Sequence, residues 1–347
     1  MTFNLNKIVS PNILSLAPYR CARDEFEGSA EIYLDANENP FDNGLNRYPD
    51  PYQTELKKEI ASLKNISEES IFLGNGSDEA IDLLFRIFCI PGKDNYIAIT
   101  PSYGMYEVCG NVNNVERRAA LLTDNFEIDL PQINSQIDSN TKLIFLCSPN
   151  NPSGNILDVN AVQALANNFH GVVVIDEAYI DFSFSESATT LLEKYPNIVV
   201  LQTLSKAWGL AAIRLGMAMA SKDIITLFNK VKYPYNVNLL TQEKALEYLK
   251  EKKEMVSQQI AEIISERERV KELLSTIPAV IKVFPSEANF LLVKMDEAEN
   301  IYSTLLKKGT VVRNRSKVIL CEGCLRITIG TPIENQKIIE QLTEIIA

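Results

Sequence analysis

One lysine stands out by its neighbours in the segment QTLSKAWGLAAIRLG, residues 202–216. Lys206 follows two hydroxyl residues, precedes Arg214 by eight positions, and otherwise has apolar neighbours. An ammonium group buried among such residues costs free energy unless it is neutralised, paired or used covalently, as in a Schiff base with an aldehyde. A bare Ser-Lys dipeptide is more often an exposed lysine at a helix start, so the interpretation depends on other segments.

An acidic residue ends an apolar run thirty positions upstream, in GVVVIDEAYIDF, residues 171–182. The run predicts a buried parallel strand ending at Asp176, and in open α/β sheets the ligand crevice lies outside the carboxyl ends of the strands. A carboxylate there can keep a ring nitrogen protonated, which pyridoxal phosphate requires as an electron sink, and Tyr179 could reach the phenolate oxygen of that ring. Taken alone, Asp176 is more simply a turn or N-cap carboxylate.

Two further segments place polar residues directly after short strands. LIFLCSPNNPSGN, residues 143–155, puts Asn151 in a polar turn where it could donate to the ring oxygen, although Asn-Pro turns are common. IFLGNGSDEAIDLLF, residues 71–85, runs through two glycines into a helix that opens with Ser77 and Asp78. Free amides at a helix start bind phosphate, but acids there also suit plain capping.

In this order and at these spacings, the four segments resemble the fold-type I pyridoxal-phosphate aminotransferases, in the branch that contains aspartate and histidinol-phosphate aminotransferases. The resemblance implies that Lys206 carries the cofactor as a Schiff base and that Asp176 pairs with the pyridinium nitrogen. It further implies that Tyr179 and Asn151 hold the ring hydroxyl. The cofactor phosphate would be held by Ser77, Asp78, Thr203, Ser205 and Arg214. The two hydroxyls, the free backbone amides at the helix start and the guanidinium are all donors that can bind a phosphate dianion.

Other segments extend the resemblance over nearly the whole chain and narrow it to the histidinol-phosphate aminotransferase family: LAPYRCAR (16–23), LDANENP (34–40), NRYPD (46–50), PSYGMY (101–106), VVRNR (311–315) and GCLRITIG (323–330). In that family Tyr103 would lie over the cofactor ring, and Tyr48 would reach the phosphate of the neighbouring subunit's cofactor. The residues facing the substrate would be Tyr19, Asn37, Arg313 and Arg326. Without the family, each tyrosine would more simply be a core or interface aromatic, and each arginine a surface ion-pair residue.

The resemblance implies an aminotransferase of histidine biosynthesis, a homodimer with shared active sites. It would interconvert L-histidinol phosphate plus 2-oxoglutarate with imidazole acetol phosphate plus L-glutamate. A threonine-phosphate decarboxylase-like lyase stays open as an alternative, because it uses the same cofactor and also binds a phosphorylated amine. An aromatic or broad-specificity aminotransferase stays open within the preferred class. The intact set of reactive residues disfavours a non-catalytic cofactor-binding module.

Composition agrees with a cytoplasmic enzyme. The 347 residues are 46% hydrophobic and 23% charged, and no segment approaches the roughly 18 consecutive apolar residues of a membrane span. The net charge of −11 argues against nucleic acid or an anionic membrane as a partner. Six scattered cysteines predict no disulfide framework. The lone Cys321 and Cys324 pair predicts no metal site, since His170 is the single histidine and is expected in an exposed turn.

Strand and helix signals alternate from about residue 71 to 231 and predict the sheet that must position these residues. We expect an α/β fold of the fold-type I PLP-dependent transferase class. A mostly parallel central sheet would form a large domain, residues 37–235, followed by a smaller C-terminal α+β domain, residues 236–347. A helical stretch with a break, residues 239–277, would connect them. Residues 1–36 are expected to form an N-terminal arm that packs with the small domain or a partner subunit.

Overall fold

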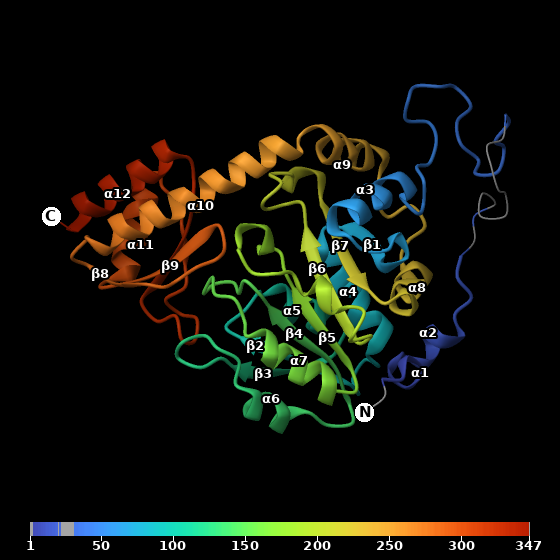
Figure 1. The fold of residues 1–347 in the computed structure, drawn as a ribbon, viewed down its shortest axis with the longest axis horizontal. Coiled ribbons are helices and arrows are strands. Elements are labelled where there is room, and N and C mark those ends of the chain that lie inside the picture. The colour runs from blue at the N-terminus through green and yellow to red at the C-terminus, as the bar shows by residue number, and fades with distance from the viewer. Residues whose placement is uncertain (1–2, 20, 22–30, 347) are drawn as a thin grey trace.

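The computed structural model describes residues 3–19, 21 and 31–346, and two sheets organise it (Figure 1). The strands of the larger sheet are β1 (Ile71–Asn75), β2 (Asn95–Thr100), β3 (Glu116–Leu121), β4 (Thr141–Cys147), β5 (Val172–Asp176), β6 (Ile198–Thr203) and β7 (Leu215–Ala220). Their order is β1-β7-β6-β5-β4-β2-β3. Only β7 runs antiparallel to its neighbours, β1 and β6. The predicted α/β fold with a mostly parallel central sheet is confirmed.

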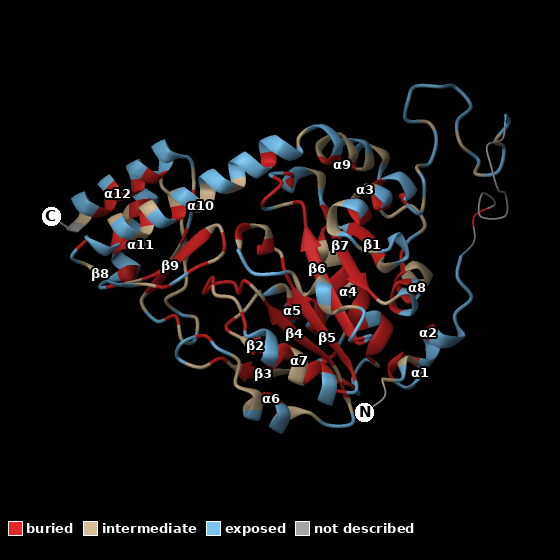
Figure 2. Ribbon diagram, in the orientation of Figure 1, coloured by how far each residue is buried: buried red, intermediate tan, exposed pale blue. Residues whose placement is uncertain are grey.

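Helices cover both faces of this sheet, which is why its central strands are continuous apolar runs. In β5, Val172 and Val174 face one buried cluster, and Val173 and Ile175 face the other. The first cluster includes α4 (Ser77–Phe88), α5 (Met105–Val112) and α8 (Lys222–Val231). The second includes α3 (Thr54–Lys64), α6 (Leu130–Gln136), α7 (Val159–Asn168) and α9 (Leu239–Glu251). Figure 2 shows the buried strands between helices whose outer sides are exposed.

The smaller sheet is antiparallel, with β8 (Val280–Val283), β9 (Phe290–Met295), β10 (Arg313–Asn314) and β11 (Cys324–Thr328) in the order β10-β11-β9-β8. Its core is shared with α10 (Lys253–Ser275), α11 (Ala298–Lys307) and α12 (Pro332–Ile346). The predicted break in the connecting stretch lies at Lys252, between α9 and α10. β10 is the shortest of these strands, with two residues.

Short helical turns complete the connections: η2 (Glu68–Ser70), η3 (Ile180–Phe182), η4 (Ala188–Leu191) and η5 (Ala211–Ile213). His170 lies exposed between α7 and β5, as expected from the sequence. All six cysteines are free and buried. Within the described ranges, no helix is both long and apolar enough to cross a membrane.

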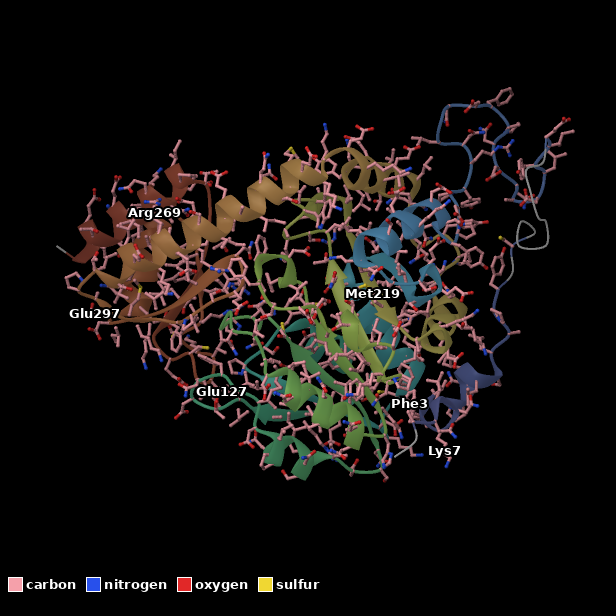
Figure 3. The ribbon with its side chains drawn as sticks, in the orientation of Figure 1. Phe3, Lys7, Glu127, Met219, Arg269 and Glu297 are labelled. Carbon is pink, nitrogen blue, oxygen red and sulfur yellow. The ribbon has the colours of Figure 1, made fainter. Side chains whose placement is uncertain are left out.

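The N-terminal segment packs on the larger sheet's helices rather than on the smaller sheet, which differs from one of the two expected placements. Ile8 and Ile13, on α1 (Leu5–Ile8) and α2 (Pro11–Ser15), join the apolar cluster of α4 and α8. Lys230 of α8 also donates to the Leu14 carbonyl at 2.9 Å. Figure 3 labels Phe3 and Lys7 at the end of the molecule opposite Arg269 and Glu297. Residues 20, 22 and 23 of the LAPYRCAR motif lie outside the described residues.

Candidate active site

The carboxyl ends of β4, β5 and β6 open into a hollow that the start of α4 also borders. Its lining is Gly76, Ser77, Asp78, Tyr103, Cys147, Asn151, Asp176, Ala178, Tyr179, Thr203, Ser205, Lys206 and Arg214. Every residue expected around the cofactor, apart from Tyr48, is therefore brought to one place from five separate segments. A hollow at this edge is where parallel α/β sheets bind their ligands.

Asp176 is the last residue of β5, and only 2% of its surface is exposed. The Tyr106 hydroxyl donates to its Oδ2 at 2.7 Å, and the Ala178 N–H donates to its Oδ1 at 3.1 Å. Burial raises the pKa of the carboxyl to about 6, while these two hydrogen bonds oppose the rise. A cationic ligand group beside it would favour the charged form, so the carboxylate is placed to pair with a protonated ring nitrogen.

A hydrogen-bonded chain links the hollow to the smaller sheet. The Asn151 Nδ2 donates to the Tyr179 hydroxyl at 3.4 Å, and both side chains are buried. On its other side, Asn151 accepts through Oδ1 from the Nη1 of Arg326, on β11, at 2.6 Å. Arginine has only donors, so Asn151 must turn its amide oxygen toward Arg326. The NH₂ group of Asn151 therefore points toward the Tyr179 hydroxyl. The pair can therefore present donors to one ligand oxygen.

Lys206 lies in the turn between β6 and η5, so the helix-start alternative does not apply. The residue is open toward the hollow, and its Nζ lies 5.7 Å from the centroid of the Tyr179 ring. Partial burial lowers the pKa of the ammonium, and the charge of Arg326 lowers it further, whereas Asp176 opposes this. A lower pKa increases the share of neutral amine, which is the nucleophilic form.

The opposite end of the hollow has the features of an anion site. Thr203 Oγ1 and Ser205 Oγ lie 3.0 Å apart, beside the first turn of α4. Gly76, which precedes α4, has a φ of +75°, and a Cβ there would lie 2.7 Å from the Nη2 of Arg214. Because glycine has no Cβ, the space beside Gly76 stays free. The backbone amides at the start of α4 and the guanidinium of Arg214 can therefore approach the same ligand. The fit is to a phosphate.

The carboxylate of Asp78 has partners of its own within this anion site. Tyr103 donates to its Oδ1 at 3.1 Å, and the Nη2 of Arg214 lies 3.7 Å from its Oδ2. Its backbone N–H, in the first turn of α4, is then the group that can donate to a phosphate. Asp78 thus orders two side chains of the site rather than offering its own oxygens to an anion.

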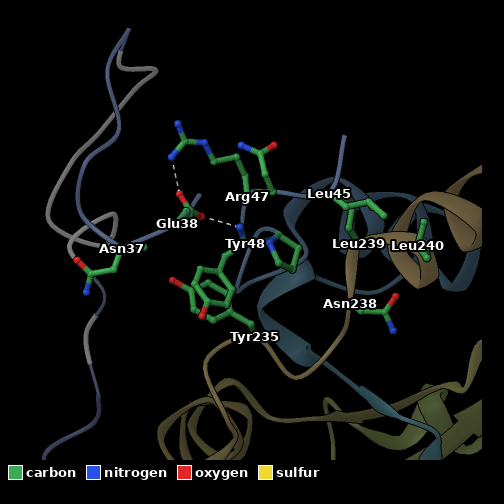
Figure 4. A pocket seen from close by; sticks show the side chains of 12 residues that line it. Asn37, Glu38, Leu45, Arg47, Tyr48, Tyr235, Asn238, Leu239 and Leu240 are labelled. Atoms are coloured by element: carbon green, nitrogen blue, oxygen red, sulfur yellow. Dashed lines mark hydrogen bonds and ion pairs between the residues drawn. The ribbon is translucent and has the colours of Figure 1, made fainter. Parts of the chain in front are cut away.

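Arg313, exposed on β10, does not line this hollow. Three more expected site residues, Tyr19, Asn37 and Tyr48, also lie outside it in the same chain. Asn37 and Tyr48 line a second hollow with Arg47, Asn238 and others (Figure 4). There Tyr48 stacks on Tyr235 with the ring centroids 4.4 Å apart. Tyr19 is 72% exposed. These positions require a second chain if the three are to contact the cofactor or the substrate.

Sequence reasoning missed Tyr106 and Glu177. Tyr106 stands at the end of the PSYGMY motif, but nothing in the spacing shows that α5 aims its hydroxyl at Asp176. Glu177 is buried and accepts from the Ala188 N–H and the Ser187 hydroxyl, each at 2.6 Å, which fixes the segment after β5. The place of Glu177 directly after the strand could have revealed it. Because side chains alternate along a strand, Glu177 points to the face opposite that of Asp176.

Comparison with known proteins gives consistent matches. The family described as "Aminotransferase class I and II" matches residues 29–342. The histidinol-phosphate aminotransferase of Parabacteroides distasonis is 56% identical over 339 residues, and that of Flavobacterium johnsoniae is 54% identical over 344 residues, each covering 98% of both chains. The crystal structure of the histidinol-phosphate aminotransferase from Clostridium acetobutylicum has a TM-score of 0.79 and 28% identity, over 87% of this chain and 91% of that one.

Proposed function

Because this chain belongs to the class I and II aminotransferases, we propose that it transfers an amino group between L-histidinol phosphate and 2-oxoglutarate, with pyridoxal 5'-phosphate as cofactor. The products are imidazole acetol phosphate and L-glutamate, a step of histidine biosynthesis. The observation that carries the proposal is the meeting of Lys206, the buried Asp176 and the Asn151–Tyr179 pair around one hollow. The name shared by its relatives supports the choice of substrate.

The hollow offers a partner for each group of pyridoxal phosphate. Lys206 has an amine for the aldehyde, Asp176 a carboxylate for the ring nitrogen, and Asn151 with Tyr179 donors for the phenolate. Tyr103 would lie against the ring. The phosphate would take the first-turn amides of α4 at Ser77 and Asp78, the hydroxyls of Thr203 and Ser205, and the guanidinium of Arg214. When bound, the cofactor supplies a pyridinium ring that stabilises negative charge on the α-carbon of the substrate.

The protein's own groups then hold and move protons. Asp176 keeps the proton on the ring nitrogen, because its buried carboxylate is stabilised by a cation next to it. With the cofactor bound, Lys206 as a neutral amine would be the base that takes the proton from the substrate α-carbon and delivers it to the C4′ carbon of the cofactor. Asn151, held by Arg326, keeps the Tyr179 hydroxyl and its own amide directed at one oxygen. These groups are fixed before the reaction, so little reorganisation is needed.

We further propose a homodimer in which Tyr48 reaches the phosphate of the partner's cofactor, and in which Tyr19 and Asn37 complete the substrate site. Exposed apolar side chains near these residues support the dimer, since Leu34 is 86% and Phe41 is 80% exposed. Large apolar side chains that are this exposed in one chain can be covered by a second chain. Arg313 and Arg326 would bind substrate anions.

The division into an arm (1–36), a large domain (37–235) and a small domain (236–347) is likewise our proposal. The separate core of the smaller sheet with α10, α11 and α12 supports the division. Within residues 236–347, α9 packs on α3 beside the larger sheet, and the chain leaves that sheet at Lys252. We also propose that the enzyme works in the cytoplasm, which six free cysteines support, because disulfides are rare in reducing compartments.

Single-turnover absorbance changes of the holoenzyme test the function. Histidinol phosphate and glutamate should each convert the aldehyde form of the cofactor to the amine form, whereas histidinol and phenylalanine should react far more slowly. Borohydride reduction and peptide mapping should find the cofactor on Lys206, and Lys206→Ala should lose both the link and the turnover. Equal reaction with histidinol or phenylalanine would indicate a broad aminotransferase. Carbon dioxide release from threonine phosphate would indicate a lyase.

A further inference from the structure

Three arginines of the smaller sheet converge at the side of the hollow that Arg326 borders. Arg313 on β10 lies directly opposite Arg326 on β11 in the strand register. Arg315 follows two positions later, and its N–H continues the pairing to the Cys324 carbonyl at 2.9 Å. The residue between them, Asn314, donates to Glu299 at 2.9 Å. Because side chains alternate along a strand, Arg313 and Arg315 share the face of Arg326.

In the described part of the chain, no acidic side chain compensates the charge of this cluster. Among the residues that the structure describes, no carboxylate lies within ion-pair distance of the three guanidinium groups. The Nε atoms of Arg315 and Arg326 are buried without a hydrogen-bond partner in this part of the chain. Burial lowers the pKa of Arg315, and the charges of Arg326 and Arg313 lower it further. Like charges on directly opposite strand positions destabilise a sheet.

A structural arginine elsewhere in the fold shows the contrast. Arg267 on α10 is almost fully buried, yet its Nη1 donates to the carbonyls of Phe182 and Ala288, and its Nε donates to Glu268. Its burial is therefore satisfied within the chain. Arg315 is only half-buried and has no such set of acceptors. An anion from solution is the partner that this cluster lacks.

We propose that Arg315 binds the phosphate of the substrate together with Arg326, and so sets the preference for a phosphorylated amine. This inference rests on the proposed function. Arg326 donates to Asn151, which lines the same hollow as Lys206, so a substrate whose amine meets Lys206 could extend its phosphate toward the cluster. Arg313 is exposed, whereas Arg315 is half-buried, so water and salt screen its charge less.

Single-turnover kinetics of the holoenzyme measure this preference. In Arg315→Gln, the ratio of the rate constants for histidinol phosphate over histidinol should fall by about tenfold to a hundredfold, because one charge-assisted contact to the phosphate is lost. The reaction with glutamate should change much less. Arg315→Lys should restore part of the ratio, since lysine keeps the charge but not the fork. The matched control is Lys307→Gln, which removes one exposed positive charge on α11.

Chemical labelling gives a readout that does not depend on turnover. Phenylglyoxal modifies accessible arginines, and peptide mass mapping reports each site. With the cofactor phosphate already in its own site, inorganic phosphate should slow the labelling of Arg315 in the holoenzyme. It should leave Arg86 unaffected, because that side chain is half-exposed on α4 and pairs with Asp82.

The outcomes separate the two proposals. An unchanged preference in Arg315→Gln, or labelling of Arg315 that phosphate does not slow, would overturn the role of Arg315 and leave the proposed function intact. If the wild-type enzyme reacts equally with histidinol and histidinol phosphate, the proposed function is wrong. In that case the substrate preference no longer tests Arg315, and the effect of inorganic phosphate on its labelling decides whether Arg315 binds phosphate.

Discussion

The hydrogen bond from Tyr106 to Asp176 should control the charge of the carboxylate at the base of the site. Burial alone raises the pKa of Asp176, and the 2.7 Å bond from Tyr106 opposes this, so that the pKa is about 6 instead of the ordinary 3.8. A hydrogen bond to a charged group contributes about 1.5 to 3 kcal/mol, and one pKa unit corresponds to about 1.4 kcal/mol. Tyr106→Phe should therefore raise the pKa of Asp176 by about one to two units.

The sign of the stability change follows from the raised pKa. A carboxyl group whose folded pKa lies above its unfolded value binds protons more tightly in the folded state. Its contribution to stability is present at low pH and is lost as the pH rises from 3.8 to about 6. Across that window the cofactor-free wild type should lose about 3 kcal/mol from this group. In Tyr106→Phe the loss should continue to a pH about one to two units higher.

Carbon-13 NMR titration of the aspartate carboxyls in the cofactor-free protein measures the pKa directly, and urea unfolding at several pH values measures the stability. Tyr195→Phe is the matched control, because it removes another buried tyrosine hydroxyl, one that donates to Gln163 at 3.0 Å. That variant should leave the pKa of Asp176 unchanged. A lower or unchanged pKa in Tyr106→Phe would refute the reasoning.

Three further changes test the rest of the site. Asp176→Asn should keep the fold but lower the single-turnover rate about a thousandfold, since an amide cannot hold the ring nitrogen protonated; near-normal rates would contradict the electron-sink role. Gly76→Ala should weaken cofactor binding about tenfold or more, because the added Cβ would press on Arg214 at a positive φ; an unchanged dissociation constant in an absorbance titration would argue against the phosphate site. Tyr48→Phe should weaken cofactor retention, and mixing it with Lys206→Ala should recover part of the activity in hybrid dimers; sedimentation showing an active monomer would exclude shared sites.

The local pattern of the sequence was enough to locate most residues of the hollow. Asp176 was predicted at the carboxyl end of a strand because four apolar residues precede it, and it lies there at the end of β5. Gly76 and Ser77 were predicted at the start of a helix, and α4 begins at Ser77. Strand ends and helix starts depend on residues adjacent in the chain, so a single sequence carries this information.

Contacts between segments that are far apart in the chain could not be predicted from the sequence in this way. The hydroxyl of Tyr106 reaches Asp176 over seventy positions, and Arg326 reaches Asn151 over 175. One of the two placements expected for the N-terminal segment, against the small domain, is not found for residues 3–15, because a short stretch without periodicity does not indicate which apolar face it covers. In the structure, Ile8 and Ile13 join the apolar cluster that α4 and α8 contribute to.

The sequence by itself determined the alternation of strands and helices, the family, and the positions of Lys206 and Asp176 at strand ends, since these depend on local periodicity and on motifs that are contiguous in the chain. Only the tertiary structure decided which groups tune them. It set the hydrogen bond on Asp176 and the hydrogen-bonded chain through Asn151 to the smaller sheet. It also placed Arg315 beside Arg326, with its Nε unpaired among the residues that the structure describes. The physical reason is that a pKa or an unpaired charge depends on burial and on neighbours within a few ångströms, and folding brings these together from remote parts of the chain.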